Sequence, residues 1–223
     1  MSYLLIWDID GTLIQSRRVG RRAMDRAFFE LYGIENGFEA INMAGGLDSI
    51  ILRDALKLHG LAGMDPVTFF DRYCEYLKDE INKMNCSFTA PGISELLPVL
   101  HSSGSFYNVL GTGNIEKGAR IKLDNGGLNK YFSTGGFGDE PLERWQVIKK
   151  AVINGCSHFQ KDFAKEQIYV IGDTPKDIEC GKIIGVKTIG TAKGPYTAAE
   201  LKNCGADYAF DDLSNVKSFM DIF

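Results

Sequence analysis

The fold of this chain is decided by the stretch Tyr3-Leu4-Leu5-Ile6-Trp7-Asp8-Ile9-Asp10-Gly11-Thr12-Leu13, an apolar run that leads into two aspartates. Side chains at positions i and i+2 of a strand point to the same side, so Asp8 and Asp10 are predicted to face one site. Like charges this close repel each other, and burying them is costly. A hard divalent cation is the simplest compensation. The stretch therefore predicts a metal-assisted reaction centre, in preference to a plain Asp-Gly turn.

The composition excludes several classes of protein. The chain has 223 residues, 44% of them hydrophobic, and a formal net charge of −4. This suits one core, or a core with an inserted module, and argues against a nucleic-acid groove or a polybasic membrane anchor. Its five cysteines are scattered without a C-x-x-C pair, so neither a disulfide framework nor a zinc site is expected. The first apolar run is too short for a signal peptide or a membrane span. We expect a cytoplasmic protein, monomeric or homodimeric, without nucleic-acid or membrane partners.

Short apolar strands alternate with helical patterns over most of the chain. Strands are predicted at 3–7, 106–110, 167–171, 186–189 and 207–210, with a weaker one at 132–134. Helices are predicted between them at 115–123, 144–153, 177–184 and 198–202. Such alternation is typical of a parallel sheet covered on both faces. The predicted fold class is therefore α/β, with a Rossmann-like, doubly wound parallel sheet as its core.

One long segment after the first strand departs from this alternation. It shows no convincing strand between Ser16 and about Asn85, and its apolar residues recur at helical spacing. The helical patterns cover 21–32, 49–58 and 66–84. We interpret the segment as an all-helical cap domain inserted into the core, with Pro91-Gly92 marking the return. The predicted domains are a core of residues 1–15 and 88–223 and a cap of residues 16–87.

Two later strands also end in polar residues. The segment Gly111-Thr112-Gly113-Asn114 precedes a helix, where a hydroxyl and unhindered amides can form an anion site, although the same residue types make ordinary N-caps. The segment Gly172-Asp173-Thr174-Pro175-Lys176-Asp177 follows another strand. Ligands of open parallel sheets bind beyond the carboxyl ends of the strands. Asp173 is therefore predicted to complete a cation site with Asp8 and the backbone carbonyl of Asp10.

A basic residue lies between these two segments. The candidates are Arg144, Lys149 and Lys150, in the predicted helix after Gly138-Asp139-Glu140-Pro141. A positive charge at the start of a helix opposes the helix dipole. This favours a functional role for Arg144, with a solvated surface charge as the alternative reading.

Taken in order, these segments resemble the four motifs of the haloacid dehalogenase (HAD) superfamily. The motifs are Asp8-Ile9-Asp10-Gly11-Thr12-Leu13, Thr112 with Gly113-Asn114, Arg144, and Gly172-Asp173-Thr174-x-x-Asp177. The resemblance covers nearly the whole chain and is nearest to the phosphoglycolate phosphatase-like hydrolases with a helical cap. Relatives commonly carry a Lys before the last motif. Here Arg144 takes that place, with Lys149 as the alternative.

The resemblance implies phosphoryl transfer through an aspartyl-phosphate. Asp8 would be the nucleophile. Asp10 would act as general acid and then as general base, which requires a raised pKa. Asp8, the Asp10 carbonyl and Asp173 would hold Mg²⁺. The remaining roles are phosphoryl binding by Thr112, Gly113, Asn114 and Arg144, and orientation of Arg144 or of a metal-bound water by Asp177.

The resemblance also sets the expected substrate and its alternatives. We expect a small phosphorylated metabolite, such as phosphoglycolate or a sugar phosphate, read by the cap through Asp48 at a helix start and through Arg21. An ordinary N-cap at Asp48 and a solvated basic face are the alternative reading. A β-phosphoglucomutase-type phosphotransferase is the rival activity, but such enzymes carry a His where this chain has Gly20. A catalytically idle protein of the same fold is a further alternative, although every acid of the motifs is present.

Overall fold

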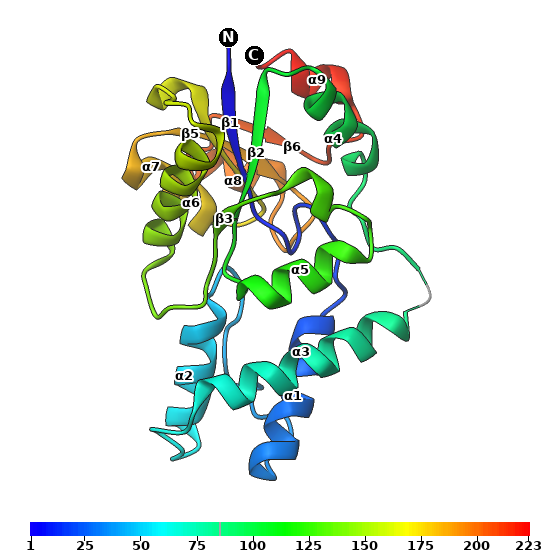
Figure 1. The fold of residues 1–223 in the computed structure, drawn as a ribbon, viewed down its shortest axis with the longest axis vertical. Helices are drawn as coiled ribbons and strands as arrows, with labels where there is room; N and C mark the ends of the chain where they lie inside the picture. The colour runs from blue at the N-terminus through cyan, green and yellow to red at the C-terminus, as the bar shows by residue number, and fades with distance from the viewer. Residues whose placement is uncertain (85) are drawn as a thin grey trace.

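A computed structural model describes residues 1–84 and 86–223. It confirms the α/β fold with a six-stranded parallel sheet in the order β3-β2-β1-β4-β5-β6 (Figure 1). The strands are β1 Tyr3–Trp7, β2 Phe106–Gly111, β3 Gly135–Gly136, β4 Ile168–Gly172, β5 Lys187–Thr191 and β6 Tyr208–Phe210. The weak strand expected at 132–134 forms just downstream, as β3 at one edge of the sheet. None of the described helices has the length and apolarity needed to cross a membrane.

Helices cover both faces of the sheet. They are α4 Ile93–Ser102, α5 Glu116–Asp124, α6 Arg144–Phe159, α7 Pro175–Ile184, α8 Ala198–Asn203 and α9 Val216–Met220. Successive residues of β1 face opposite layers because strand side chains alternate. Leu4 and Ile6 belong to the apolar cluster under α6 and α7, whereas Trp7 stacks on Phe219 of α9. The α4 and α9 helices were not expected. Pro98 interrupts the helical pattern of α4, which nonetheless continues through it.

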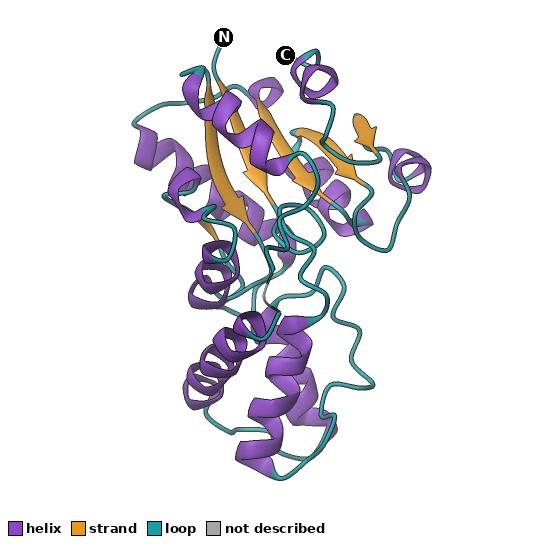
Figure 2. Cartoon of the chain, turned by 90° about the vertical axis from the view of Figure 1, so that its right-hand side faces the viewer, coloured by secondary structure: helices purple, strands orange, loops and turns teal. Residues whose placement is uncertain are grey.

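Three helices form a block between β1 and β2. They are α1 Val19–Tyr32, α2 Asp48–Leu58 and α3 Pro66–Asn82, which lie together below the sheet in Figures 1 and 2. Their shared core contains Ala23 and Phe28 of α1 with Phe69 and Leu77 of α3. This confirms a helical insertion between the first two strands. Its division from the core at residues 16 and 87 stays a prediction, and Asn85, near the expected boundary, lies outside the described residues.

The helical block joins the core through two adjacent connections. The backbone N–H of Gln15 donates to the Phe88 carbonyl at 2.7 Å, and the N–H of Ala90 donates to the Leu13 carbonyl at 2.9 Å. Ile14 and Thr89 form an antiparallel bridge between them. The chain therefore leaves and re-enters the core at one place, beside the end of β1.

The sheet order determines where the polar segments meet. β1 pairs with β2 on one side and with β4 on the other, all in parallel. Asp8, Thr112 and Asp173 each follow one of these three strands. Because the carboxyl ends of parallel strands share one edge of the sheet, the three residues are brought side by side.

Candidate active site

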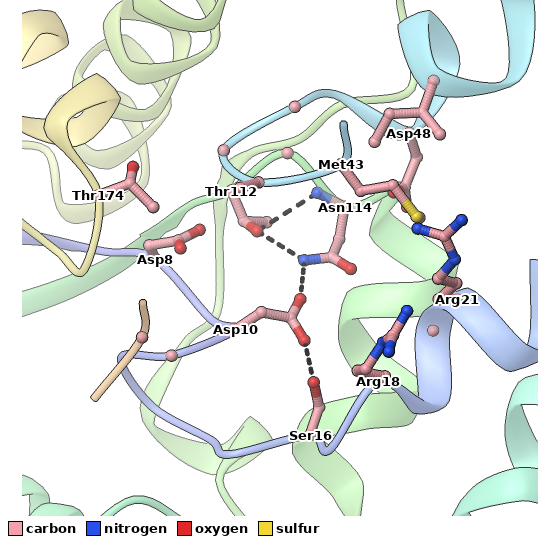
Figure 3. A pocket seen from close by; sticks show the side chains of 18 of the residues that line it. Asp8, Asp10, Ser16, Arg18, Arg21, Met43, Asp48, Thr112, Asn114 and Thr174 are labelled. Carbon is pink, nitrogen blue, oxygen red and sulfur yellow. Dashed lines mark hydrogen bonds between the residues drawn. The ribbon is translucent and has the colours of Figure 1, made fainter. Parts of the chain in front are cut away.

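A cavity of about 760 Å³ lies between the carboxyl ends of the strands and the helical block. It is lined from the core by Asp8, Asp10, Thr112, Gly113, Asn114, Arg144 and Asp173, and from the helical block by Arg21, Asp48 and Tyr73. Figure 3 shows Asp8 and Asp10 facing this space, with Arg18 and Arg21 on the opposite, cap side. Of the site residues expected from the sequence, Asp177 alone is not among the lining residues. Residues of all four sequence motifs therefore line one cavity together with residues of the helical block.

Of the basic candidates in the predicted helix, Arg144 lines this cavity, whereas Lys149 is exposed on the same helix. The Arg144 Nη2 atom lies 3.1 Å from Asp8 Oδ1 and donates to Asp177 Oδ1 at 2.7 Å. Its Nε also donates to Asp177 Oδ1, at 3.1 Å. Burial by itself would lower the pKa of Arg144, but the charges of Asp177 and Asp8 outweigh burial and raise it. The guanidinium is therefore a permanent cation directed at Asp8.

Asp177 has its acceptor positions filled by protein donors. Its Oδ1 accepts both bonds from Arg144, and its Oδ2 accepts from the Thr174 N–H at 3.1 Å and the Thr174 hydroxyl at 2.7 Å. The bonds to Thr174 are the capping interaction that starts α7. Asp177 thus links the start of α7 to Arg144 and fixes the direction of the guanidinium.

Asp8, Asp173 and Asp177 form a group that could hold a metal ion. One carboxylate oxygen from each lies within 4.8 Å of the others, and all three residues are buried. The Asp173 Oδ1 atom is buried without a hydrogen-bond partner among the described residues. A Cβ on Gly11 or Gly194 would come within 2.2 or 1.6 Å of Asp173 Oδ2, so this carboxylate sits in a cradle of bare backbone.

The electrostatics of this group fit a hard cation. Burial, followed by the charge of Asp8, raises the pKa of Asp173 to about 9. Burial also raises the pKa of Asp8 to about 7, against the opposing charge of Arg144. Both shifts have burial as their main cause, and neighbouring carboxylates add to it. An all-oxygen, acidic donor set suits Mg²⁺, and the free acceptors for it belong to Asp8 and Asp173, since Asp177 is already occupied.

Asp10 corrects two expectations drawn from the sequence. Its Oδ2 accepts from Lys122 Nζ at 2.6 Å and from Asn114 Nδ2 at 2.9 Å, and its Oδ1 accepts from the Ser16 hydroxyl at 2.6 Å. Burial would raise the pKa of Asp10, but the Lys122 charge and these hydrogen bonds outweigh it and lower the pKa. The expected upward shift is therefore wrong. The sequence also suggested a metal ion as the compensating charge for the Asp8–Asp10 pair, whereas the structure places a lysine beside the Asp10 carboxylate.

Lys122 lies in the site but was not among the residues predicted from the sequence. Its side chain is only 6% exposed, and besides Asp10 it donates to Asn114 Oδ1 at 2.5 Å. The available signal was its position on the apolar stripe of α5, in register with Ile115 and Ala119 at helical spacing. A lysine on such a stripe usually extends to solvent, which is why the pattern alone did not indicate a site.

The polar groups of the segment after β2 are hydrogen-bonded to one another. The Asn114 side chain donates to Thr112 Oγ1 at 2.8 Å, and the Asn114 backbone N–H approaches the same oxygen at 3.3 Å (Figure 3). Asn114 therefore connects the Thr112 hydroxyl to Asp10 and Lys122. Of the groups expected to bind a phosphoryl oxygen, the backbone N–H of Asn114 already has a partner in the protein, as does its side-chain amide.

The helical block is fastened to the core at the start of α2. The Asp48 N–H donates to the Gly113 carbonyl at 2.8 Å, and the Ser49 N–H donates to the Gly138 carbonyl at 3.2 Å. The Asp48 carboxylate accepts from the Ile115 N–H at 3.0 Å. The N-cap of α2 is Leu47, and not Asp48. Asp48 thus both lines the cavity and bonds to the core.

Arg21 lines the cavity from α1. Its Nη2 donates to the Phe38 carbonyl, and its Nε lies 3.7 Å from Asp25 within the same helix. These contacts hold the side chain against the helical block. Met43 and Asp48 line the same cavity (Figure 3).

Comparison with known proteins shows which family this chain resembles. The sequence model described as haloacid dehalogenase-like hydrolase matches residues 5–191. A phosphoglycolate phosphatase of Aquifex aeolicus is 28% identical over 226 aligned residues, which cover 98% of this chain and 96% of the relative. A phosphoglycolate phosphatase of Pseudomonas putida is 25% identical, covering 94% of this chain and 76% of its own length. The crystal structure of a hydrolase from Pseudomonas syringae shares the fold, with a TM-score of 0.72 at 19% identity over 100% of this chain and 99% of that one.

The close approach of two core glycines beside the site leads to a prediction for Gly138→Ala. A Cβ at this position would lie 2.0 Å from the Gly113 carbonyl oxygen, a backbone atom that cannot turn aside. The Thr112–Asn114 segment must then shift, and misplacement of a site by about 1 Å can cost about 10²-fold in rate. We expect kcat/KM to fall by about that factor while the far-UV circular dichroism spectrum is unchanged.

Gly155→Ala is the matched control for this experiment. It lies in α6, and its added Cβ would meet only the side-chain methyl groups of Leu4 and Val109, at 3.1 Å. We expect Gly155→Ala to keep full activity. Equal activity of the two variants would show that the Gly113–Gly138 contact does not shape the site.

Proposed function

This chain belongs to the haloacid dehalogenase-like hydrolases, and we propose that it is a magnesium-dependent phosphatase that hydrolyses a small phosphorylated metabolite. The observation that carries the proposal is the setting of Asp8. Its carboxylate is buried at the end of the central strand, 3.1 Å from the fixed Arg144 guanidinium and beside the open acceptor of Asp173. A nucleophile between a permanent cation and a place for a second one is suited to attack an anionic phosphate ester.

In the proposed first step, an Asp8 oxygen attacks phosphorus and the bond to the leaving oxygen breaks, which gives an aspartyl-phosphate. Arg144 stabilises charge on the phosphoryl oxygens in transit, together with the Thr112 hydroxyl and the Gly113 amide. Asp177 keeps the guanidinium in position throughout. A bound magnesium ion, held by Asp8, Asp173 and the Asp10 carbonyl, would offset the repulsion between the carboxylate and the phosphate.

Asp10 serves as the acid–base residue in this proposal. It begins as the carboxylate of an ion pair, so the proton for the leaving oxygen passes through Asp10 from the Lys122 ammonium that touches it. In the second step Asp10 takes a proton from the attacking water, which cleaves the aspartyl-phosphate, and the proton returns to Lys122. The paired carboxylate is well suited to the base role, and the adjacent ammonium supplies what the acid role needs.

The position of the helical block over the cavity supports an inference about the class of substrate. The helical block covers the site and bonds to the core through backbone groups, so a folded phosphoprotein or a duplex cannot reach Asp8 while these contacts are made. Two distant relatives are named phosphoglycolate phosphatase. We infer a metabolite of that size, phosphoglycolate or a sugar phosphate, with the helical block acting as a cap domain of residues 16–87. The mutase alternative is not favoured, because Gly20 provides no side chain at the cap position where mutases carry a His.

Metal removal is the first test. Phosphate release from p-nitrophenyl phosphate should stop with excess EDTA and return with added Mg²⁺. The cation should also raise the thermal unfolding midpoint, because it binds the folded state through carboxylates that otherwise repel each other. Activity that survives complete chelation would contradict the metal assignment.

Asn substitutions at Asp8 and Asp10 should fail in different ways. Asp8→Asn should abolish phosphoenzyme formation, measured by mass spectrometry of the acid-quenched protein. Asp10→Asn should slow the hydrolysis of alkyl phosphates by about 10²–10⁴-fold, the usual contribution of general acid–base catalysis. Release of p-nitrophenolate, which needs no proton, should be slowed less in the first step. Equal losses for both leaving groups would exclude Asp10 as the acid.

Arg144 and Arg21 should affect different parts of the reaction. Arg144→Ala should lower kcat/KM by about 10²–10³-fold for every ester, because its partner is the phosphoryl group common to all of them. Arg144→Lys keeps the charge and should recover part of this loss. Arg21→Ala should change the ranking of substrates in a panel of kcat/KM values. The assignment is wrong if Arg21→Ala acts uniformly and Arg144→Ala selectively.

A further inference from the structure

We propose that Asp48 of the helical block is a positioning residue, which aligns the phosphoryl-binding segment 112–114 when the block packs on the core. The inference rests on the proposed phosphatase function and deepens it, because it gives a role in the reaction to a residue outside the groups that act on phosphorus. Asp48 lies in the first turn of α2, and its bonding partner Ile115 follows the segment directly as the N-cap of α5. The two residues belong to different parts of the molecule, so their contact exists only while block and core are together.

Asp48 holds the segment through two hydrogen bonds of opposite polarity. Its backbone N–H donates to the Gly113 carbonyl at 2.8 Å, and its carboxylate Oδ2 accepts from the Ile115 N–H at 3.0 Å. These two core groups lie on either side of Asn114. Because hydrogen bonds are directional, a donor and an acceptor bonded two residues apart fix both the position and the orientation of the backbone between them. The backbone of Asn114 is therefore aligned by Asp48.

The start of α5 depends on these contacts because the helix has no side-chain cap of its own. The first N–H groups of a helix need partners outside it, and the N-cap residue Ile115 makes no side-chain cap hydrogen bond. The Asp48 carboxylate accepts from the Ile115 N–H, and the Asp139 carboxylate accepts from the Glu116 N–H at 3.0 Å. Carboxylates at this end also complement the helix dipole. One of the two comes from the helical block, so the block completes the start of a core helix.

The groups aligned in this way would serve every substrate. The Asn114 side chain donates to the Thr112 hydroxyl and to Asp10. The α5 helix also carries Lys122, the ion-pair partner of Asp10. In the proposed reaction Thr112 acts on the phosphoryl group, whereas Asp10 and Lys122 transfer the proton. A displaced segment would therefore impair both functions, whatever the leaving group.

The Asp48 carboxylate is buried at a cost that the core offsets. The residue is 7% exposed. Burial raises the pKa of Asp48 to about 6, while the charge of Lys122 and the Ile115 N–H, both core groups, act in the opposite direction. The backbone of the block also lies against the segment, since a Cβ on Gly113 would come within 1.9 Å of the Gly46 carbonyl oxygen. The segment therefore has these partners only while the block is packed on the core.

The kinetics of Asp48→Ala test the assignment. We expect kcat/KM to fall about 10–100-fold, the factor that corresponds to one hydrogen bond to a charged group. The loss should be similar for every ester that the wild type hydrolyses among p-nitrophenyl phosphate, phosphoglycolate and glucose 6-phosphate, and it should appear in kcat. Asp48→Asn keeps an acceptor oxygen for the Ile115 N–H and should recover most of the activity. A loss confined to one ester would place Asp48 against the leaving group and overturn the assignment.

Asp54→Ala is the matched control on the same helix. The Asp54 carboxylate accepts hydrogen bonds from the neighbouring Arg53, and both side chains are exposed. Surface ion pairs of this kind contribute little to stability. We expect Asp54→Ala to keep the kcat/KM of the wild type for all three esters. A loss as large as that of Asp48→Ala would show that α2 tolerates no such change, and would remove the support for a specific role of Asp48.

Amide hydrogen exchange gives a readout that needs no turnover. In ligand-free protein the Ile115 N–H, followed by NMR, should exchange about 10–100-fold faster in Asp48→Ala, because its acceptor is lost. The Leu110 N–H, which donates to the Thr134 carbonyl at 3.1 Å beside the sheet, should exchange at the wild-type rate. Equally faster exchange at both amides would indicate a general loss of stability and would refute the positioning role.

The outcomes separate this proposal from the proposed function. If the wild type hydrolyses the esters while Asp48→Ala changes neither kcat nor the exchange of the Ile115 amide, the positioning role is refuted and the phosphatase function stands. If the wild type hydrolyses none of them but Asp48→Ala accelerates exchange at Ile115 alone, the proposed function fails and the alignment of the segment by Asp48 stands.

Discussion

The concentration of carboxylates at one edge of the sheet is the constraint on which the rest of the site depends. Asp8 and Asp10 follow β1, Asp173 follows the neighbouring β4, and Asp177 lies in the first turn of α7. Asp8, Asp173 and Asp177 are buried. Negative charges buried this close together are tolerated only with opposing charges. Two buried cations, Arg144 and Lys122, supply part of this compensation, and the remaining acceptors of Asp8 and Asp173 are left for a metal ion.

The two buried cations have separate functions because each belongs to a different carboxylate. Arg144 starts α6 and connects Asp8 to the Asp177 cap of α7, so the position of Asp8 is tied to the starts of two helices. Lys122 lies on the buried face of α5 and holds Asp10 together with Asn114. Asp8 and Asp10 are thus oriented by separate side-chain contacts.

The contact between cap and core combines backbone hydrogen bonds at the start of α2 with side-chain bonds such as that of the Asp48 carboxylate to the Ile115 N–H. Glycines at 46, 113 and 138 approach so closely that a Cβ on Gly113 would lie 1.9 Å from the Gly46 carbonyl oxygen. Backbone contacts of this kind define the closed geometry without dictating the substrate. The cap contributes a charged and an aromatic side chain, Arg21 and Tyr73, to the wall of the cavity. In the proposed reaction, groups of the core would act on the phosphoryl group and groups of the cap would meet the leaving group.

The sequence by itself determined the parallel α/β fold, the helical insertion and the order in which Asp8, Thr112 and Asp173 follow their strands. It could do so because periodicity and strand ends are local properties, and parallel pairing brings strand ends together. Only the tertiary structure decided between Arg144 and Lys149, filled the acceptors of Asp177, and paired Asp10 with a lysine 112 residues away. Gly20, Tyr73 and Lys122 likewise come close to one another from three separate helices. Such pairings depend on how helices pack across the fold, and packing distances between remote elements leave no periodic trace in the chain.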